Sequence, residues 1–285
     1  MNQMELAFIQ RFILDRTGIV LTPEKRYLVE TRLDPVMRHF QIASLSAVAA
    51  RLRQGDRELE LAVIDAMTTN ETLFFRDRLP FEMFQNIIMP QLIAARRQAG
   101  KIRIWCAACS SGQEPYSLSM ILDDMRAQLA GIVVEIVATD ISRKVLQQAQ
   151  EGIFSQFEVQ RGLPIKLLLK HFTQVSPRWH INKALGERIR FKAQNLLLPF
   201  RALGTFDLIF CRNVLIYFDE ATKRDVLGRL AEVMAPDSYL MLGGAETVLG
   251  LSPQLAPHVS ERSLYVRHDS PQAHAIKSIR SRLTA

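Results

Sequence analysis

Apolar residues recur at helical spacing throughout the first 70 residues of the chain. Phe8, Ile9, Phe12 and Ile13 fall on one face of a helix predicted over residues 4–16, because positions three and four apart share a helix face. Three further helices are predicted in the same way, one from Thr22, one from Ser44 and one over residues 56–67. The stretch lacks strand-like alternation, so we expect an all-helical N-terminal domain over residues 1–78.

From residue 79 onward, short apolar runs alternate with helical segments. Strands are predicted near residues 101–106, 133–140, 188–196, 206–211, 238–246 and 262–267, and helices over 80–98, 115–128, 142–149 and 220–234. This alternation predicts a Rossmann-like α/β domain over residues 79–268, with a parallel sheet covered by helices. Residues 152–190 break the pattern and predict a small inserted β-subdomain. The polar stretch 269–285 is predicted to be a disordered tail.

The most informative stretch is residues 101–117, where a predicted strand leads through small residues into a helix. The residues from Ala107 to Gly112 carry no bulky side chain, so the backbone can approach a ligand closely. Ser111 and Glu114 have the spacing of a capping box, and Pro115 suits a first helical turn. We therefore predict a nucleotide cradle at this strand end, although an ordinary strand–turn–helix joint would show the same pattern.

The chemistry of this turn narrows the class of ligand. It holds one glycine rather than three, and no Gly-Lys-Ser/Thr follows, which disfavours dinucleotides and phosphate-binding loops. The carboxylate of Glu114 would repel a phosphate and attract a cation. S-adenosylmethionine fits this requirement, since it carries an ammonium and a sulfonium but no phosphate. Asp140, at the end of the second predicted strand, is placed to accept hydrogen bonds from ribose hydroxyls.

Polar residues also crowd two other positions near this predicted edge of the sheet. The junction between the two domains reads MTTNETLFFRD (67–77), and hydroxyls beside aromatics at such a junction favour a ligand site. A capped helix start with buried phenylalanines explains much of this stretch too, but explains Arg76 less well. Cys211, Arg212 and Asn213 follow the strand predicted over 206–211, where open α/β sheets bind ligands.

Composition and charge exclude several functional classes. Three cysteines are too few for a disulfide framework, and no second pair of ligands completes a zinc site with Cys106 and Cys109. These two cysteines are therefore interpreted either as small residues at a strand end or as a redox pair. The net charge of +7 lies in no Lys/Arg run, so nucleic acid is not indicated. Without an apolar run of about 18 residues or a secretion signal, we expect a cytoplasmic protein that needs no metal and does not enter the membrane.

Basic residues follow one side of the second predicted helix. Lys25, Arg32 and His39 recur every seventh residue, which keeps them on nearly one face, and Arg26 and Arg38 flank that face. Such a stripe is typical of a solvated surface, but it also suits an acidic partner.

Taken together, these motifs resemble the CheR family of S-adenosylmethionine-dependent protein-glutamate O-methyltransferases, which modify bacterial chemotaxis receptors. The matching blocks are TTNETLFFRD, AACSSGQEPYS, ATDI and CRNVLIYF, with LGGAE as a weaker fifth. The likeness spans nearly all of residues 5–268. It implies a helical N-terminal domain, a class I methyltransferase domain and a small inserted β-subdomain.

The resemblance also implies roles for individual residues. Glu114 would take the ammonium of S-adenosylmethionine and Asp140 its ribose, and the product would be S-adenosylhomocysteine. The other residues expected at the cofactor are Asn70, Thr72, Arg76, Gly112, Asn195, Leu196, Cys211 and Arg212. Arg76 and Arg212 would orient the substrate carboxylate, and Tyr217 would stand near the transferred methyl.

Two departures from the family pattern change what we expect of the partner. Gln113 replaces the first of two acids usual after the glycine, so the negative charge rests on Glu114. The insert is a few residues shorter than in members that dock on a C-terminal receptor pentapeptide, so we expect no such tether. We expect instead direct binding to the receptor's cytoplasmic helical bundle through Lys25, Arg26, Arg32 and Arg38. A small-molecule methyltransferase and a non-catalytic cofactor-binding module are the alternatives.

Overall fold

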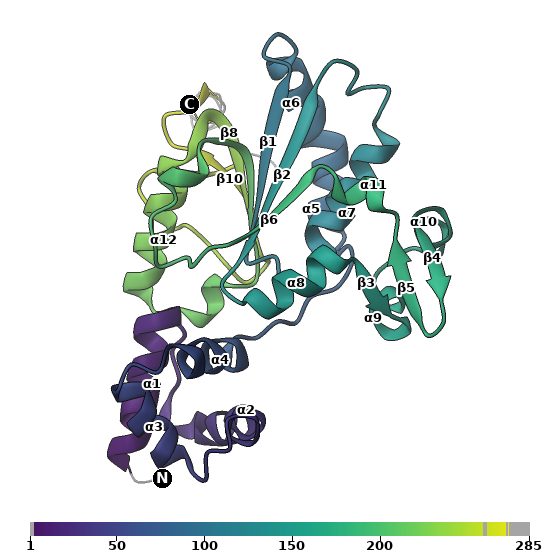
Figure 1. The fold of residues 1–285 in the computed structure, drawn as a ribbon. Coiled ribbons are helices and arrows are strands. Elements are labelled where there is room, and N and C mark those ends of the chain that lie inside the picture. The colour runs from purple at the N-terminus through teal and green to yellow at the C-terminus, as the bar shows by residue number, and fades with distance from the viewer. Residues whose placement is uncertain (1–2, 259–260, 272, 274–285) are drawn as a thin grey trace.

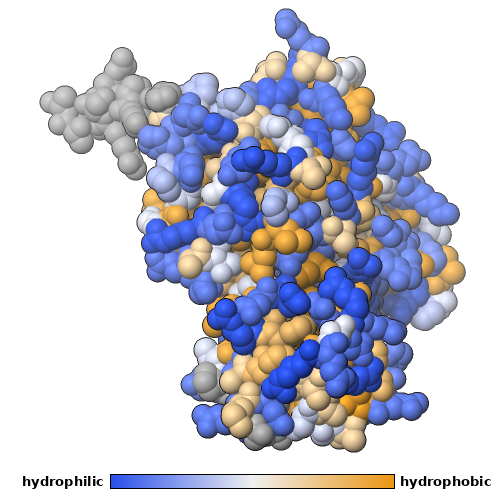
Figure 2. All heavy atoms as spheres, turned by 60° about the vertical axis from the view of Figure 1, so that its left-hand side comes forward, coloured by the Kyte–Doolittle hydropathy of each residue, from blue (hydrophilic) through white to orange (hydrophobic). Residues whose placement is uncertain are grey.

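The computed structural model describes residues 3–258, 261–271 and 273. A helical unit built from residues 3–67 lies below a larger α/β unit, and the linker after it runs up into the α/β unit (Figure 1). The face shown in Figure 2 is mostly hydrophilic, with apolar side chains gathered where the two units meet. Every helix in the described part of the chain is too short or too polar to span a lipid bilayer.

The N-terminal unit contains the four predicted helices. They are α1 (Gln3–Thr17), α2 (Arg26–His39), α3 (Leu45–Arg53) and α4 (Arg57–Met67), with a 3₁₀ turn over Pro23–Lys25 before α2. Ser44 and Asp56 cap α3 and α4, each accepting a backbone N–H of the first turn, which is the usual role of such residues at a helix start. Their apolar faces meet in a separate core that includes Ile9, Val29 and Val63.

The α/β unit is built on a seven-stranded sheet in the order β6-β2-β1-β7-β8-β10-β9. The strands are β1 (Lys101–Ala107), β2 (Val133–Asp140), β6 (Ile189–Ala193), β7 (Phe206–Cys211), β8 (Met234–Leu242), β9 (Leu255–Pro257) and β10 (Leu264–Arg267). The first five strands in the sheet order are parallel, and β10 is antiparallel to both its neighbours. This is the Rossmann-like class predicted from the alternation of elements, although β9 was not foreseen.

Helices cover both faces of this sheet. They are α5 (Leu79–Met83), one π turn over Phe84–Ile88, α6 (Met89–Arg96), α7 (Gln113–Asp124), α8 (Arg143–Glu151) and α12 (Glu220–Glu232), with 3₁₀ turns at Arg201–Leu203 and Leu215–Tyr217. Side chains of β1 alternate between two cores: Ile104 and Cys106 join one, Trp105 joins the other. Because both faces of β1 are buried, it lies at the centre of the fold.

A small subdomain is inserted between α8 and β6 (Figure 1). It holds a three-stranded antiparallel sheet in the order β3-β5-β4 and three short helices. Its elements are β3 (Ile153–Ser155), α9 (Gln156–Gln160), α10 (Ile165–His171), β4 (Phe172–Val175), β5 (Arg178–Ile181) and α11 (Lys183–Gly186). Phe154 and Phe172 pack against Phe74 of the linker, with ring centroids 5.0 and 5.7 Å away. The insert therefore contacts the junction between the two larger units.

Two local expectations need correction or restriction. The capping box of Ser111 and Glu114 does not form: α7 starts after Gly112 in a left-handed conformation, and Ser111 Oγ donates to Gln113 Oε1 instead. The reason is long-range, because a buried arginine takes the Glu114 carboxylate. The predicted tail over 269–285 falls mainly outside the described residues, but within the described part Ser270 and Ala273 are buried.

Candidate active site

A pocket of about 920 Å³, its open mouth included, lies where the predicted strand ends meet. Its walls come from the turn after β1, the start of α7, the end of β2, the segments after β6 and β7, the linker before α5, and the end of α1 with the residues that follow it. Parallel strands bring their carboxyl ends to one edge of the sheet, which explains why segments far apart in sequence converge here. The pocket thus lies at the edge that the sequence predicted for a ligand.

Most of the predicted site residues line this pocket. Those in its walls are Asn70, Thr72, Arg76, Glu114, Asp140, Asn195, Leu196, Arg212 and Tyr217. Gly112 and Cys211 are not among the lining residues. Gly112 begins α7, and a Cβ there would lie 2.9 Å from Ala149 Cβ, so its role is close packing. Cys211 is fully buried within β7.

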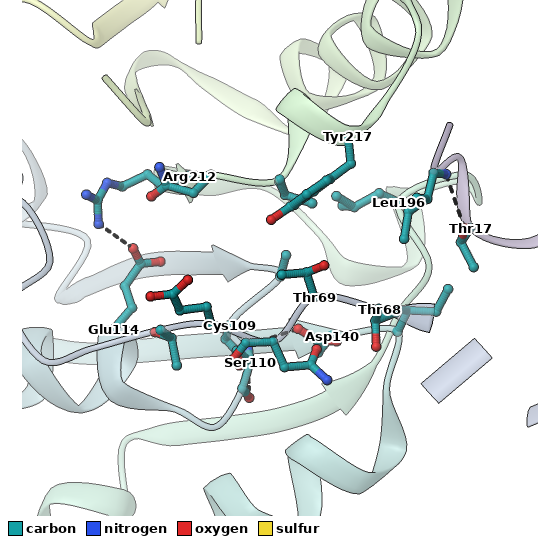
Figure 3. A pocket seen from close by; sticks show the side chains of 18 of the residues that line it. Thr17, Thr68, Thr69, Cys109, Ser110, Glu114, Asp140, Leu196, Arg212 and Tyr217 are labelled. Atoms are coloured by element: carbon teal, nitrogen blue, oxygen red, sulfur yellow. Dashed lines mark hydrogen bonds and ion pairs between the residues drawn. The ribbon is translucent and has the colours of Figure 1, made fainter. Parts of the chain in front are cut away.

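A buried ion pair forms one end of the pocket (Figure 3). Arg212 Nη1 donates to Glu114 Oε2 at 2.9 Å, and the two side chains are only 2% and 12% exposed. Arg212 Nη2 donates to Asp77 Oδ2 at 2.7 Å and to the Arg76 carbonyl at 2.9 Å. Burial raises the pKa of Glu114, and the positive charge of Arg212 opposes that rise. The guanidinium therefore ties α7, β7 and the linker together.

The same ion pair leaves binding capacity for a ligand. Arg212 Nε is buried and has no hydrogen-bond partner among the described residues. A buried donor without a partner is costly, so a ligand acceptor at this position would be favoured. Glu114 is bonded through one oxygen, which leaves its carboxylate able to accept from a cation. This end of the pocket thus suits a ligand that carries both an ammonium and a carboxylate.

Asp140 forms a second polar position on one wall of the pocket, across from Tyr217 (Figure 3). Its Oδ2 accepts from the Ser110 N–H and its Oδ1 from the Ser142 N–H, both at 2.9 Å. Burial raises the pKa of Asp140, and these backbone hydrogen bonds oppose the rise. The two amides fix the carboxylate in place while further lone pairs remain, so it can accept from a vicinal diol.

The far end of the pocket is closed by the N-terminal unit. Thr17, the last residue of α1, lies near Leu196 in the pocket wall (Figure 3), and Ile19, two residues later, lines the wall as well. Asn195 Nδ2 donates to the Arg16 carbonyl at 2.7 Å, and the Val20 N–H donates to the Tyr217 carbonyl at 3.0 Å. No sequence signal pointed to Thr17 or Ile19, because residues at and just past the end of an amphipathic helix are equally typical of its core.

The basic stripe on α2 is largely occupied by partners within the chain. Arg32 Nη1 donates to the Met67 carbonyl at 2.8 Å and Nη2 to Thr69 Oγ1 at 3.0 Å, so this arginine secures the linker that lines the pocket. Arg26 and Arg38 form ion pairs with acids one turn away on the same helix, each at 2.7 Å. Arg32 is therefore a structural link as well as part of the stripe.

Neither the cysteines nor the candidate metal ligands bring a reactive group to the pocket, although Cys109 lies in its wall. Cys106, Cys109 and Cys211 are free and buried, and burial raises the pKa of each thiol, which makes them unreactive. Among the described residues, one group has metal-ligand spacing, Asp123, Asp124 and His171. Lys170 already forms ion pairs with both of these aspartates, at 3.3 and 2.5 Å.

Comparison with known proteins agrees with this architecture. Residues 4–68 match the all-alpha domain of the CheR methyltransferases, and residues 70–263 match their SAM-binding domain. The chain is 44% identical over 246 residues to Chemotaxis protein methyltransferase 1 of Pseudomonas aeruginosa, covering 85% of this chain and 89% of that protein.

Further relatives show the same extent of similarity. The Chemotaxis protein methyltransferase of Vibrio parahaemolyticus is 39% identical over 255 residues, covering 88% of this chain and 92% of that protein. Chemotaxis protein methyltransferase Cher2 of Pseudomonas putida is 42% identical over 246 residues, covering 84% and 89%. Most of the pocket lies within the region matched to the SAM-binding domain, while Thr17, Ile19, Thr68 and Thr69 of its wall precede that region. The chain belongs to the CheR family of S-adenosylmethionine-dependent methyltransferases.

Proposed function

We propose that this protein transfers a methyl group from S-adenosylmethionine to the side-chain carboxylate of glutamates in chemoreceptor cytoplasmic domains. The products would be glutamate methyl esters and S-adenosylhomocysteine. One observation carries the proposal most directly: a buried Glu114–Arg212 pair and a buried Asp140 line a single pocket, with Tyr217 facing into it. The names of the relatives, chemotaxis protein methyltransferases, support the choice of substrate and a place in the cytoplasm.

The donor set of the pocket fits S-adenosylmethionine. Glu114 would accept from its ammonium, and the unpartnered Arg212 Nε–H would donate to its carboxylate. Asp140 would accept from both ribose hydroxyls, since two backbone amides already hold it in position. Asn195 and Leu196 would flank the adenine, with Asn70 and Thr72 closing the pocket from the linker.

When bound, S-adenosylmethionine supplies an electrophilic methyl on a sulfonium, which a carboxylate oxygen can attack in line. A free glutamate is already ionised at neutral pH, because its pKa is about 4.3, so the protein need not supply a general base. The chain contributes by positioning the carboxylate against the sulfonium methyl and by excluding water. Holding two reacting groups together in this way can correspond to an effective molarity of about 10⁵ M or more.

Arg76 is the better of the two arginines to orient the substrate carboxylate. It is half-buried in the pocket wall, donates to the Glu71 carbonyl, and forms no salt bridge with the described residues. Arg212, which the sequence also nominated, has its guanidinium engaged by Glu114 and Asp77. We therefore assign Arg212 to holding Glu114, and Arg76 together with the Tyr217 hydroxyl to the substrate.

Transfer of labelled methyl to a purified chemoreceptor cytoplasmic fragment tests this function. We expect label that is released as methanol by base, and none on a fragment whose acceptor glutamates are changed to alanine. Arg76→Ala should lower transfer while Arg78→Ala, at an exposed neighbouring arginine outside the pocket wall, should not. Base-stable label, or transfer only to a small molecule, would contradict the proposal.

The receptor's helical bundle would contact the basic face of α2, without a C-terminal pentapeptide tether and without nucleic acid. The ion pairs of Arg26 and Arg38 are exposed and therefore weak, so an acidic partner can replace them. The double variant Lys25→Glu/Arg26→Glu should raise KM for the receptor fragment, whereas Arg11→Glu on exposed α1 should not. Equal KM values in these two variants would exclude this face.

A further inference from the structure

Glu246 is a buried carboxylate to which the proposed chemistry assigns no role. It lies after β8 and is 8% exposed, yet no Lys or Arg in the described part of the chain forms a salt bridge with it. Burying a carboxylate without a cation is costly unless hydrogen bonds replace the lost water. The contacts of Glu246 therefore show where its charge is compensated.

Four backbone amides compensate this charge. Glu246 Oε2 accepts from the N–H groups of Asn213 at 2.8 Å and Gly243 at 2.6 Å. Its Oε1 accepts from the N–H groups of Val214 at 3.0 Å and Leu215 at 2.8 Å. Three successive amides pointing at one anion form a nest, and Asn213 adopts the left-handed φ of 57° that such a turn requires. Glu246 thus occupies, from within the chain, the place of a bound anion.

This nest immediately precedes Tyr217. The Tyr217 N–H donates to the Val214 carbonyl at 3.2 Å, and the Tyr217 carbonyl accepts from the Val20 N–H of the N-terminal unit at 3.0 Å. Arg212, which holds Glu114, is the residue just before the nest. A shift of the nest would therefore move the tyrosine side of the pocket and its contact with the helical unit.

Resting on the proposed function, we propose that Glu246 is a positioning residue for methyl transfer, which sets the loop between Arg212 and Tyr217 through these four hydrogen bonds. Glutamine has nearly the same shape but one acceptor oxygen, and its NH₂ group would face two backbone N–H donors. Aspartate keeps the charge but falls one methylene short. The charge and both oxygens are therefore needed, which distinguishes this site from a side chain that only fills space.

Gly243 offers a second way to disturb the nest without removing the carboxylate. A Cβ at Gly243 would lie 2.7 Å from Glu246 Oε2 and 2.9 Å from the Asn213 N atom, which is closer than real Cβ contacts. A Cβ at the adjacent Gly244 would meet nothing within 4 Å. Gly243→Ala and Gly244→Ala thus form a matched pair: each adds one methyl group, but only the methyl at position 243 would collide with the nest.

The experiment combines turnover, cofactor binding and amide exchange on the full chain. For Glu246→Gln and Gly243→Ala we expect kcat for receptor methylation to fall about 10-fold or more, since a displacement of about 1 Å can cost that much. The dissociation constant for S-adenosylhomocysteine should change by less than about threefold, because a well-formed cradle remains. Glu246→Asp should lie between wild type and Glu246→Gln, and Gly244→Ala should match wild type.

Hydrogen exchange of the peptide covering 213–217 separates this inference from the proposed function. We expect faster exchange there in Glu246→Gln than in wild type, with exchange in the helices of the N-terminal unit unchanged. Unchanged exchange in 213–217 of Glu246→Gln would overturn the inference. A kcat of Glu246→Gln equal to that of Gly244→Ala would overturn it as well. If wild type itself methylates no receptor fragment, the proposed function fails, and the exchange measurement still decides the role of Glu246.

Discussion

Removing the positive charge of Arg212 should expose how much the fold depends on the Glu114–Arg212 pair. The two charges are 2.9 Å apart and their side chains are 2% and 12% exposed. At an effective dielectric constant near 20, such a pair attracts by about 4–6 kcal/mol. Taking away one partner of a buried pair costs about 3–5 kcal/mol, because the other charge remains buried alone. We expect Arg212→Met to lower the free energy of unfolding by about 4 kcal/mol.

The double variant tests whether the unpaired charge causes that loss. Glu114→Gln in the Arg212→Met background removes the stranded carboxylate, so part of the lost stability should return, with a coupling energy of about 2 kcal/mol or more. The assay is urea unfolding of the protein without cofactor, followed by the fluorescence of Trp105 and Trp179, of which Trp105 lies in the sheet core.

An ion pair whose cation is exposed provides the control. Arg190 pairs with Glu135 at 3.1 Å, and the Arg190 side chain is 78% exposed. The buried Glu135 carboxylate also pairs with Lys101 and Arg103, so Arg190→Met leaves no buried charge alone and should cost less than about 1 kcal/mol. If the losses of Arg212→Met and Glu114→Gln simply add in the double variant, within about 0.5 kcal/mol, the two residues are not coupled and the reasoning is refuted.

Three further outcomes follow from the geometry. The folded-state pKa of Glu114 is raised, so its contribution to the stability of the cofactor-free protein is present at low pH and lost as pH rises through that pKa. The affinity for S-adenosylhomocysteine should rise over the same pH interval, because the ionised carboxylate accepts from the ligand's ammonium. Calorimetry should show that the affinity of Glu114→Gln depends less on pH than the affinity of the wild type. Asp140→Asn should weaken S-adenosylhomocysteine binding by about 1.4 kcal/mol or more, about tenfold, and unaltered affinity would contradict the ribose assignment. Gly162→Ala should lower the urea midpoint of unfolding, because the added Cβ would lie 2.1 Å from the Phe74 carbonyl oxygen at a φ of 82°. Gly131 has a similar φ but open space around it, so Gly131→Ala measures the backbone strain alone.

The sequence predicted the sheet and the edge of the pocket because both depend on local patterns. Asp140 and Arg212 come directly after apolar runs, and strand ends in a parallel sheet must converge, so their proximity follows from chain geometry. The capping box at Ser111 failed because Arg212, 98 residues from Glu114, provides a stronger partner than the helix terminus. No local pattern could reveal a competitor so far along the chain.

Contacts between segments far apart in the sequence were also beyond sequence reasoning. Arg32 was expected on a surface stripe, but it reaches the end of α4 and the linker, which only the packing of α2 against α4 brings within range. Thr17 and Ile19 reach the pocket because the N-terminal unit packs against the segment around Asn195.

The strand β9 was missed because it has three residues, one of them a proline, which leaves no alternation to recognise.

The wall that the helical unit contributes to the pocket has a consequence for exchanging parts between relatives. The N–H of Val20 and the carbonyl of Arg16 bond to Tyr217 and Asn195, so the helical unit completes the compartment in addition to covering it. In a chimera that takes residues 1–68 from one relative and the remainder from another, the two sides of this compartment would come from different proteins, and their contacts would not be matched. Grafts meant to change substrate choice should therefore cross over before Arg16 or carry the facing loops along.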